Sequence, residues 1–269
     1  MTIRPVQKEF LFGVIGNPVR HSLSPKMMNA AFEALGLPAV YLAFEVEGLE
    51  GALETFAKMG FRGLSVTIPH KEDARRLAGE VDETAAAIGA VNTLRWKEGR
   101  WEGCNTDWLG TVRALEAATP LEGRRAAVLG AGGAARGVVY GLGREGAEVT
   151  VSNRTAARGE ALAEAFGARF TPLSELDGRN FDVVVQCTSV GLEGSEPHEL
   201  VPDSFFHPGM VVMDIVYRPV WTLFLLSAKK AGSRVVPGLD MLLYQGAAQL
   251  EWWLGKPAPL SVMSEALGR

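Results

Sequence analysis

The sequence is poor in cysteine, has no excess of basic residues and contains no long hydrophobic run. Its two cysteines, Cys104 and Cys187, have no spacing typical of a metal site, so we expect a reducing, cytoplasmic compartment and no metal. The net charge of −4 gives no reason to expect a nucleic-acid or membrane partner. No apolar run reaches the roughly 20 residues of a membrane-spanning helix, and the opening MTIRPVQKEF lacks the apolar core of a secretory signal.

The segments that are present are typical of an α/β protein. With 269 residues, 47% of them hydrophobic and 22% charged, the chain is long enough for two domains of ordinary size. Strand-like and helix-like segments alternate, which predicts parallel strands covered by helices. The strands are expected at 10–16, 39–46 and 62–68, and the helices at 25–36 and 49–60. Residues 90–96 and 100–105 predict a hairpin around Lys97-Glu98-Gly99.

From about residue 106 the pattern becomes that of a doubly wound nucleotide-binding unit. A helix at 106–118 is followed by a strand, a glycine turn and a helix, and strands and helices then alternate to about residue 236. The last segment, LDMLLYQGAAQLEWWLG at 239–255, predicts a long amphipathic helix. Its length suggests that it packs back onto the first unit.

The glycine turn VLGAGGAARG matches a dinucleotide-binding fingerprint. Gly130 permits the tight turn, Gly132 lets the backbone approach a pyrophosphate, and Ala135 allows close packing of helix on strand. The helix that follows offers unpaired N–H groups and positive potential to the phosphates. Because the flanking strand and helix are both predicted, a nucleotide site is favoured over a merely structural turn.

The end of the next strand indicates which dinucleotide binds. An NAD site is expected to carry a carboxylate about 20 residues after the turn, but this chain has Ser152-Asn153-Arg154-Thr155 there, with Arg158 one turn later. Guanidinium, hydroxyl and amide groups would bind a 2′-phosphate that a carboxylate would repel. The residues therefore favour NADP. The alternative, that Asn153 and Thr155 only cap the next helix, stays open and is compatible with it.

Polar side chains follow several strands of the first unit, where the carboxyl ends of strands form a ligand crevice in α/β sheets. These residues are Ser22, Ser24, Thr67, Lys71, Asn92 and Asp107. They suit a small, hydroxyl-rich acid, because serines at a helix N-terminus can bind a carboxylate. The alternative for Ser24, which precedes Pro25, is a simple N-cap.

Oxidation of an alcohol requires a base, and Lys71 is the best candidate because partial desolvation lowers the pKa of a lysine. Asp107 could orient both the lysine and the substrate hydroxyl. Taken alone, Lys71 would more often be a solvated surface charge, as most lysines are. We interpret His21 and His70, which lie in turns, as structural or peripheral.

Taken together, these motifs resemble the shikimate dehydrogenase family. The family pattern S-x-S-P appears at 22–25, N-V-T-x-P-x-K at 65–71, G-A-V-N-T at 89–93 and N-T-D at 105–107. The patterns G-A-G-G-A-A and N-R-T follow, and DIVYRPVWT (214–222) and GLDMLLYQG (238–246) resemble late family motifs. The motifs keep their order from residue 16 to residue 246.

The resemblance implies NADP-dependent interconversion of 3-dehydroshikimate and shikimate, a step toward chorismate and the aromatic amino acids. It implies an α/β substrate domain at 1–105, a Rossmann NADP-binding domain at 106–238, a cleft between them, and a C-terminal helix at 239–269 that packs back on the substrate domain. The protein is expected to be a monomer or a homodimer.

The resemblance also assigns roles to individual positions. The implied catalytic pair is Lys71 and Asp107. The implied substrate-binding residues are Ser22, Ser24, Thr67, Asn92, Tyr217 and Gln245, with Asp107 also contacting a hydroxyl. The implied cofactor-binding residues are Gly130, Ala131, Gly132, Gly133, Ala134, Asn153, Arg154, Thr155, Arg158, Thr188, Gly238 and Met241.

One position departs from the family pattern, since many members carry asparagine where this chain has Ser65. Serine is shorter but still offers a donor and an acceptor, so we expect catalysis to be retained. Two alternatives remain open. The chain could act on quinate or an aminated analogue, with relaxed substrate or cofactor use that includes NAD, or it could be a non-catalytic NADP-binding regulator. The serines at 22 and 24 and the pair Lys71 and Asp107 favour the shikimate enzyme.

Overall fold

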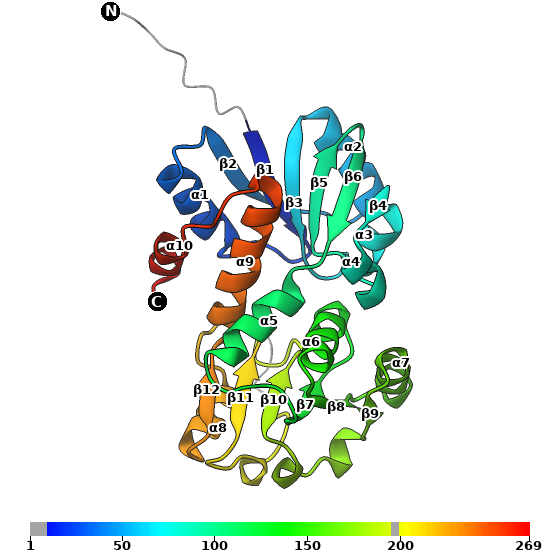
Figure 1. Cartoon of the computed structure of the whole chain (residues 1–269), viewed down its shortest axis with the longest axis vertical. Helices are drawn as coiled ribbons and strands as arrows, with labels where there is room; N and C mark the ends of the chain where they lie inside the picture. The colour runs from blue at the N-terminus through cyan, green and yellow to red at the C-terminus, as the bar shows by residue number, and fades with distance from the viewer. Residues whose placement is uncertain (1–9, 195–198) are drawn as a thin grey trace, which may run out of the picture. The chain divides into compact units, whose positions relative to one another are not determined.

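The computed structural model describes residues 10–194 and 199–269 and divides the chain into two compact units (Figure 1). Unit 1 is Met1–Thr106 with Gly246–Arg269, and unit 2 is Asp107–Gln245. The second division therefore falls inside helix α9 (Gly238–Leu254), whereas the sequence placed a boundary at residues 238 and 239. Within the described ranges, no helix is long and apolar enough to cross a membrane.

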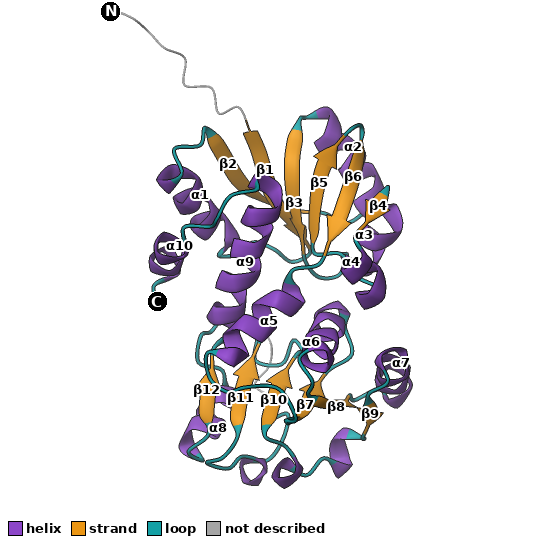
Figure 2. Ribbon diagram, in the orientation of Figure 1, coloured by secondary structure: helices purple, strands orange, loops and turns teal. Residues whose placement is uncertain are grey.

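Unit 1 is built on a six-stranded mixed sheet in the order β2-β1-β3-β5-β6-β4 (Figure 2). The strands are β1 (Phe10–Gly16), β2 (Ala39–Glu45), β3 (Phe61–Val66), β4 (Glu80–Val81), β5 (Thr93–Lys97) and β6 (Arg100–Cys104). Strand β1 pairs in parallel with β2 and β3, and β5 runs antiparallel to β3 and β6. The predicted hairpin is confirmed: Glu98 and Gly99 have φ of 50° and 82°, the two positive values that a tight two-residue turn needs.

Helices cover both faces of this sheet. They are α1 (Ser24–Ala34), α2 (Leu49–Lys58), α3 (Lys71–Leu77), α4 (Glu83–Ile88), the second half of α9, and α10 (Leu260–Leu267). The helix predicted at 239–255 is confirmed as α9, but the single helix at 239–269 that the resemblance implied is wrong. Gly255, with φ of 63°, and the prolines at 257 and 259 interrupt it, and the chain forms α9 and α10 instead.

A glycine lets α9 approach the unit 1 sheet closely. Strands β1 and β3 shift register between Leu11 and Phe12, and after the shift Gly63 pairs with Phe12. A Cβ atom on Gly63 would lie 2.7 Å from the indole of Trp253. That indole donates a 3.0 Å hydrogen bond to the Leu94 carbonyl and packs on Phe12 with ring centroids 5.1 Å apart. The missing side chain thus makes room for a tryptophan held at a fixed position.

Unit 2 is a six-stranded, fully parallel sheet in the order β12-β11-β10-β7-β8-β9, which is the doubly wound order of a Rossmann fold. Its strands are β7 (Arg125–Leu129), β8 (Glu148–Ser152), β9 (Arg169–Phe170), β10 (Val183–Gln186), β11 (Val211–Asp214) and β12 (Arg234–Val236). Its helices are α5 (Asp107–Glu116), α6 (Gly133–Arg144), α7 (Ala156–Phe166), α8 (Leu223–Lys230) and the start of α9. Short 3-10 turns lie at Leu173–Glu175, Gly178–Asn180 and Asp203–Phe205.

Side chains on both faces of the unit 2 sheet are buried, which explains the continuous apolar runs of its strands. In β7, Ala126 and Val128 belong to one hydrophobic cluster, and Ala127 and Leu129 belong to another. The predicted fold class, an N-terminal α/β substrate domain followed by a Rossmann domain, is confirmed.

We expect Gly63→Ala to lower the free energy of unfolding by about 1–3 kcal/mol, the usual cost of overpacking. The new methyl group would clash with an indole that its hydrogen bond and ring contacts prevent from moving aside. Denaturant unfolding measures the change. Gly51→Ala is the matched control: Gly51 is exposed in α2 with open space around it, so alanine should be neutral or stabilise by up to about 1 kcal/mol. Equal stability of the two variants would contradict the close-packing argument.

Candidate active site

The polar residues of unit 1 gather at one edge of its sheet. The carboxyl ends of β1, β3 and β6 lie there, and so does the amino end of β5, because that strand is antiparallel. Backbone hydrogen bonds join the loops at this edge, from Asn17 N–H to the Ile68 carbonyl (2.9 Å) and from Val66 N–H to the Asn92 carbonyl (2.7 Å). The sheet therefore brings Thr67, Lys71 and Asn92 to one edge.

The two serines follow β1 at the start of α1. The helix begins at Ser24, its N-cap position is Leu23, and no side chain caps it, so the alternative that Ser24 is a simple N-cap is wrong. The Ser22 hydroxyl instead accepts a 3.2 Å hydrogen bond from the Ser24 backbone N–H. This turn holds both hydroxyls beside the N-terminus of an 11-residue helix, where a carboxylate would be stabilised.

Lys71 and its neighbour His70 have different environments. His70 is 3% exposed, and its Nε2 lies 2.6 Å from the Val46 carbonyl, an acceptor-only group to which it must donate. This contact fits a structural role, and His21 lies exposed. Lys71 is the first residue of α3, is half-buried, and accepts at its carbonyl from Val91 N–H (2.9 Å). The contact of His70 with Val46 and the hydrogen bond from Val91 to Lys71 therefore hold the chain in place at residues 70 and 71.

Asn92 is buried among polar groups that the sequence did not identify. Its Oδ1 accepts from the Thr106 backbone N–H (2.8 Å) and from the Thr93 hydroxyl (2.7 Å). Ser65, 6% exposed, lies between the hydroxyl of Tyr41 (2.5 Å) and Oε1 of Gln249 (2.7 Å). One signal was available: Gln249 follows Gln245 by four residues, which places both on the same face of α9.

Asp107 is the first residue of α5 and is 4% exposed. One turn later, α5 packs closely on α9: a Cβ on Gly110 would lie 2.8 Å from Cβ of Gln245 and 2.9 Å from the Met241 carbonyl. Gln245 donates from Nε2 to the Leu242 carbonyl (2.9 Å). Because Gly110 has no side chain, α9 can lie against α5. The predicted site residues Met241 and Gln245 therefore lie close to the helix that carries Asp107.

The glycine turn has the geometry that a bound pyrophosphate requires. Gly130 directly follows β7 and has a φ of 122°, a conformation that favours glycine. Gly132 is the N-cap of α6, and a Cβ built there would have nothing within 4 Å, so the backbone faces open space. Ala135 is fully buried against the sheet. The remaining predicted residues, Ala131, Gly133 and Ala134, lie in the same turn. These residues fit a dinucleotide.

The end of β8 carries cationic and polar groups and no carboxylate through residue 158. Asn153 donates from its amide to the Thr155 carbonyl (2.9 Å). Thr155 occupies the N-cap position of α7, but no side-chain hydrogen bond caps that helix, so capping does not account for its hydroxyl. Arg154 and Arg158 are exposed, and the buried Ser152 hydroxyl has no protein partner. This set fits a phosphate on the ribose better than a bare hydroxyl.

A buried polar cluster at the ends of β10 and β11 holds Thr188. The Gln186 side chain accepts from Thr188 N–H and donates to Asp214 (3.2 Å), which also accepts from the Thr222 hydroxyl (2.6 Å) and Val216 N–H (2.9 Å). Burial raises the pKa of Asp214 to about 6. Sequence reasoning missed Gln186 and Asp214, because both read as ordinary ends of apolar strands.

Gly238 lies against the same cluster. A Cβ atom there would come within 2.6–2.8 Å of the carbonyl oxygens of residues 214–216, so only glycine fits. This approach places the start of α9 beside the loop that leads into the half-buried Tyr217.

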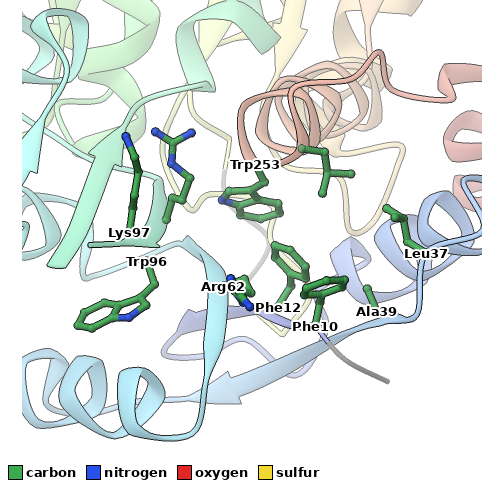
Figure 3. A pocket seen from close by; sticks show the side chains of 10 residues that line it. Phe10, Phe12, Leu37, Ala39, Arg62, Trp96, Lys97 and Trp253 are labelled. Atoms are coloured by element: carbon green, nitrogen blue, oxygen red, sulfur yellow. The ribbon is translucent and has the colours of Figure 1, made fainter. Parts of the chain in front are cut away.

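A cavity of about 270 Å³ lies at the opposite edge of the unit 1 sheet, where β1 and β2 begin (Figure 3). Figure 3 shows the aromatic side chains of Phe10, Phe12 and Trp253 gathered in it. Arg95 and Lys97 also line it, but both are paired with Glu102, whose pKa the hydrogen bond from Arg95 lowers. No predicted site residue lines this cavity. Across the described residues, no group of three or more acidic, His or Cys side chains could hold a metal.

Three family models match the chain. The shikimate dehydrogenase substrate-binding domain matches residues 14–94, the shikimate/quinate 5-dehydrogenase model matches residues 113–196, and the shikimate 5′-dehydrogenase C-terminal domain matches residues 238–267. The first covers the strand ends of unit 1, and the second begins in α5 and covers the glycine turn.

Relatives align over nearly the whole chain. An NADP-dependent shikimate dehydrogenase of Syntrophobacter fumaroxidans is 61% identical over 261 residues, covering 96% of this chain and 91% of its own. The crystal structure of the Thermus thermophilus shikimate 5-dehydrogenase with NADP(H) and shikimate is 44% identical, with a TM-score of 0.89 and coverage of 97% and 99%. A quinate dehydrogenase of Corynebacterium glutamicum in complex with NAD is 28% identical, with a TM-score of 0.87 and coverage of 96% and 98%.

The raised pKa of Asp214 predicts a pH-dependent stability. The folded protein holds the proton of this carboxyl more tightly than the unfolded chain, so the contribution is fully present below about pH 4 and is lost as the pH rises through about 6. Relative to Asp214→Asn, the wild-type protein should lose about 1 kcal/mol of unfolding free energy between pH 5 and pH 7.5.

Denaturant titrations across this pH range measure that difference. The control is Asp177→Asn: a hydrogen bond from Arg179 lowers the pKa of Asp177, so this carboxyl is ionised in the folded and unfolded states throughout the range and its contribution should not change with pH. A wild-type to Asp214→Asn difference that stays constant with pH would show that the carboxyl is already ionised at pH 5.

Proposed function

The chain belongs to the shikimate dehydrogenase family, and we propose that it interconverts shikimate and 3-dehydroshikimate with NADP as the hydride carrier. The observation that carries the proposal is the gathering of hydroxyl, amide and ammonium groups at one edge of the unit 1 sheet. The curated relative of Syntrophobacter fumaroxidans, 61% identical over 96% of the chain, supports the same reaction.

The substrate carboxylate binds the hydroxyls of Ser22 and Ser24 at the N-terminus of α1, where backbone N–H groups add positive potential. The ring hydroxyls bind Thr67, Asn92, Asp107 and Gln245, and Tyr217 lies close to the ring. Supporting this arrangement, Asn92 and Gln245 are buried, so their amides would lose hydrogen bonds if the wrong ligand were bound.

Oxidation of the alcohol releases a hydride and a proton. NADP held by unit 2 would supply the hydride acceptor, and Lys71 takes the hydroxyl proton as the general base. In the reverse direction the Lys71 ammonium returns the proton to the carbonyl oxygen. Asp107, buried at the start of α5, orients the reacting hydroxyl.

The cofactor binds unit 2. The pyrophosphate lies against the glycine turn, where Gly132 leaves space for it, and the 2′-phosphate binds the polar groups after β8. The first set is Gly130, Ala131, Gly132, Gly133 and Ala134, and the second is Asn153, Arg154, Thr155 and Arg158. Thr188, Gly238 and Met241 would hold the nicotinamide half.

Two other functions compete with this proposal. Oxidation of quinate with NAD is the activity that the name of the Corynebacterium glutamicum neighbour suggests. The absence of a carboxylate at the end of β8 argues against NAD, and the paired serines argue against quinate. A non-catalytic NADP-binding regulator would have no need for Lys71 and Asp107.

The proposal is tested by comparing initial rates with two acids and two cofactors. We expect kcat/KM with shikimate and NADP to exceed the value with quinate, or with NAD, by about tenfold or more, because buried polar groups left unpaired penalise the wrong ligand. Equal rates with either acid would overturn the shikimate assignment. Complete inactivity together with tight NADP binding would support the regulator.

Lys71→Ala should reduce kcat by about 10²–10⁴-fold with only a modest change in the KM for shikimate, as expected for a general base acting in the transition state. Steady-state rates measured across pH give both constants. Lys58→Ala is the control, because Lys58 is an exposed residue of α2 whose 3.8 Å pairing with Glu54 is worth little. An unchanged kcat in Lys71→Ala would show that another group transfers the proton.

A further inference from the structure

We propose that Gln249 and Thr93 are positioning residues that fix the orientation of the Asn92 side chain and hold Ser65 in place. Neither residue belongs to the site expected from the sequence. They connect α9 to the two strand ends at which the substrate is proposed to bind. The inference rests on the proposed function, because it concerns how that site recognises a hydroxyl of shikimate.

The direction of every hydrogen bond in this cluster follows from two backbone groups. The Asn92 carbonyl can only accept, so the group 3.2 Å from it must be the Gln249 amide nitrogen, which also donates to the Thr93 hydroxyl (2.9 Å). The Thr106 backbone N–H can only donate, so the atom 2.8 Å from it must be the Asn92 side-chain oxygen. The two amide orientations are therefore determined.

The hydroxyl protons are then fixed in turn. Because Thr93 accepts from Gln249, its own proton goes to the Asn92 side-chain oxygen, 2.7 Å away. On the other side, Ser65 donates to the Gln249 side-chain oxygen (2.7 Å), so the proton of Tyr41 goes to Ser65 (2.5 Å). A single polarised chain results, from Tyr41 through Ser65 and Gln249, and from Gln249 through Thr93 to Asn92.

Burial makes this chain effective. Tyr41 and Thr93 have no exposed surface, Gln249 is 1% exposed and Asn92 is 2% exposed. In such surroundings an unpaired amide or hydroxyl costs more than in water, so a reversed amide would place two acceptors or two donors face to face. Asn92 consequently keeps its oxygen turned to the Thr93 hydroxyl and the Thr106 backbone N–H. Its nitrogen, which donates to the Thr106 hydroxyl (3.0 Å), is the end that presents N–H groups to a substrate hydroxyl.

Thr93→Val tests the link from Gln249 to Asn92, because valine keeps the shape and removes only the hydroxyl. We expect the KM for shikimate and its dissociation constant from the protein to rise about five- to tenfold, the effect of one lost hydrogen bond, with the KM for NADP unchanged. Thr93→Ser restores the hydroxyl and should return both shikimate constants to within about twofold of wild type. Steady-state kinetics and titration calorimetry measure them.

Gln249→Met tests the same link from the helix side and should raise the KM for shikimate by at least as much as Thr93→Val. Since both residues act through one chain, the double variant should be no worse than the poorer single variant. Leu250→Met is the matched control: Leu250 is fully buried in the same turn of α9 and its replacement leaves the polar chain intact. Circular dichroism and thermal melting confirm that each variant is folded at the assay temperature.

The outcomes separate this proposal from the proposed function. Wild-type protein that does not oxidise shikimate overturns both. Wild-type protein that does so, while Thr93→Val lowers the melting temperature and leaves the shikimate constants unchanged, overturns the positioning role and shows that the chain is only structural. Additive effects in the double variant would also contradict it.

Discussion

The packing of α9 on the sheet of unit 1 is the constraint on which the substrate side of the site depends. Gly63 lacks a side chain, and the Trp253 indole occupies the space and donates to the Leu94 carbonyl. This contact anchors the last turn of α9 to strands β3 and β5. One turn earlier, Gln249 is then placed where its amide reaches the strand ends that carry Ser65 and Asn92.

The sequence predicted the elements whose signals are local. The hairpin at 97–100 followed from Glu98-Gly99 between two apolar strands, and the glycine turn at 130 followed from its strand and helix flanks. The rule that ligands bind at the carboxyl ends of strands selected Thr67 and Lys71, and Asn92 reaches the same edge because it precedes β5, which is antiparallel. In each case neighbouring residues carry the information.

Features that depend on distant residues could not be predicted in this way. Gln249 is 157 residues from Asn92 and 184 from Ser65, and its spacing of four residues from Gln245 does not reveal which strand ends its amide contacts. Asp214 ends an apolar strand, and only the folded unit shows that Gln186 and Thr222 meet it. The amphipathic pattern predicted the helix at 239–255 nearly to its ends, whereas the single helix at 239–269 that the resemblance implied ignored the prolines at 257 and 259.

Ser65 shows why a departure from a family pattern cannot be judged one residue at a time. Its short side chain leaves the space in which the Gln249 amide lies, and that amide accepts from the serine and donates toward Asn92. A longer amide at residue 65 would compete for the same space and the same partners. Residue 65 is therefore coupled to residue 249 on α9 through the 2.7 Å hydrogen bond, and a change at either position has to be judged together with the other.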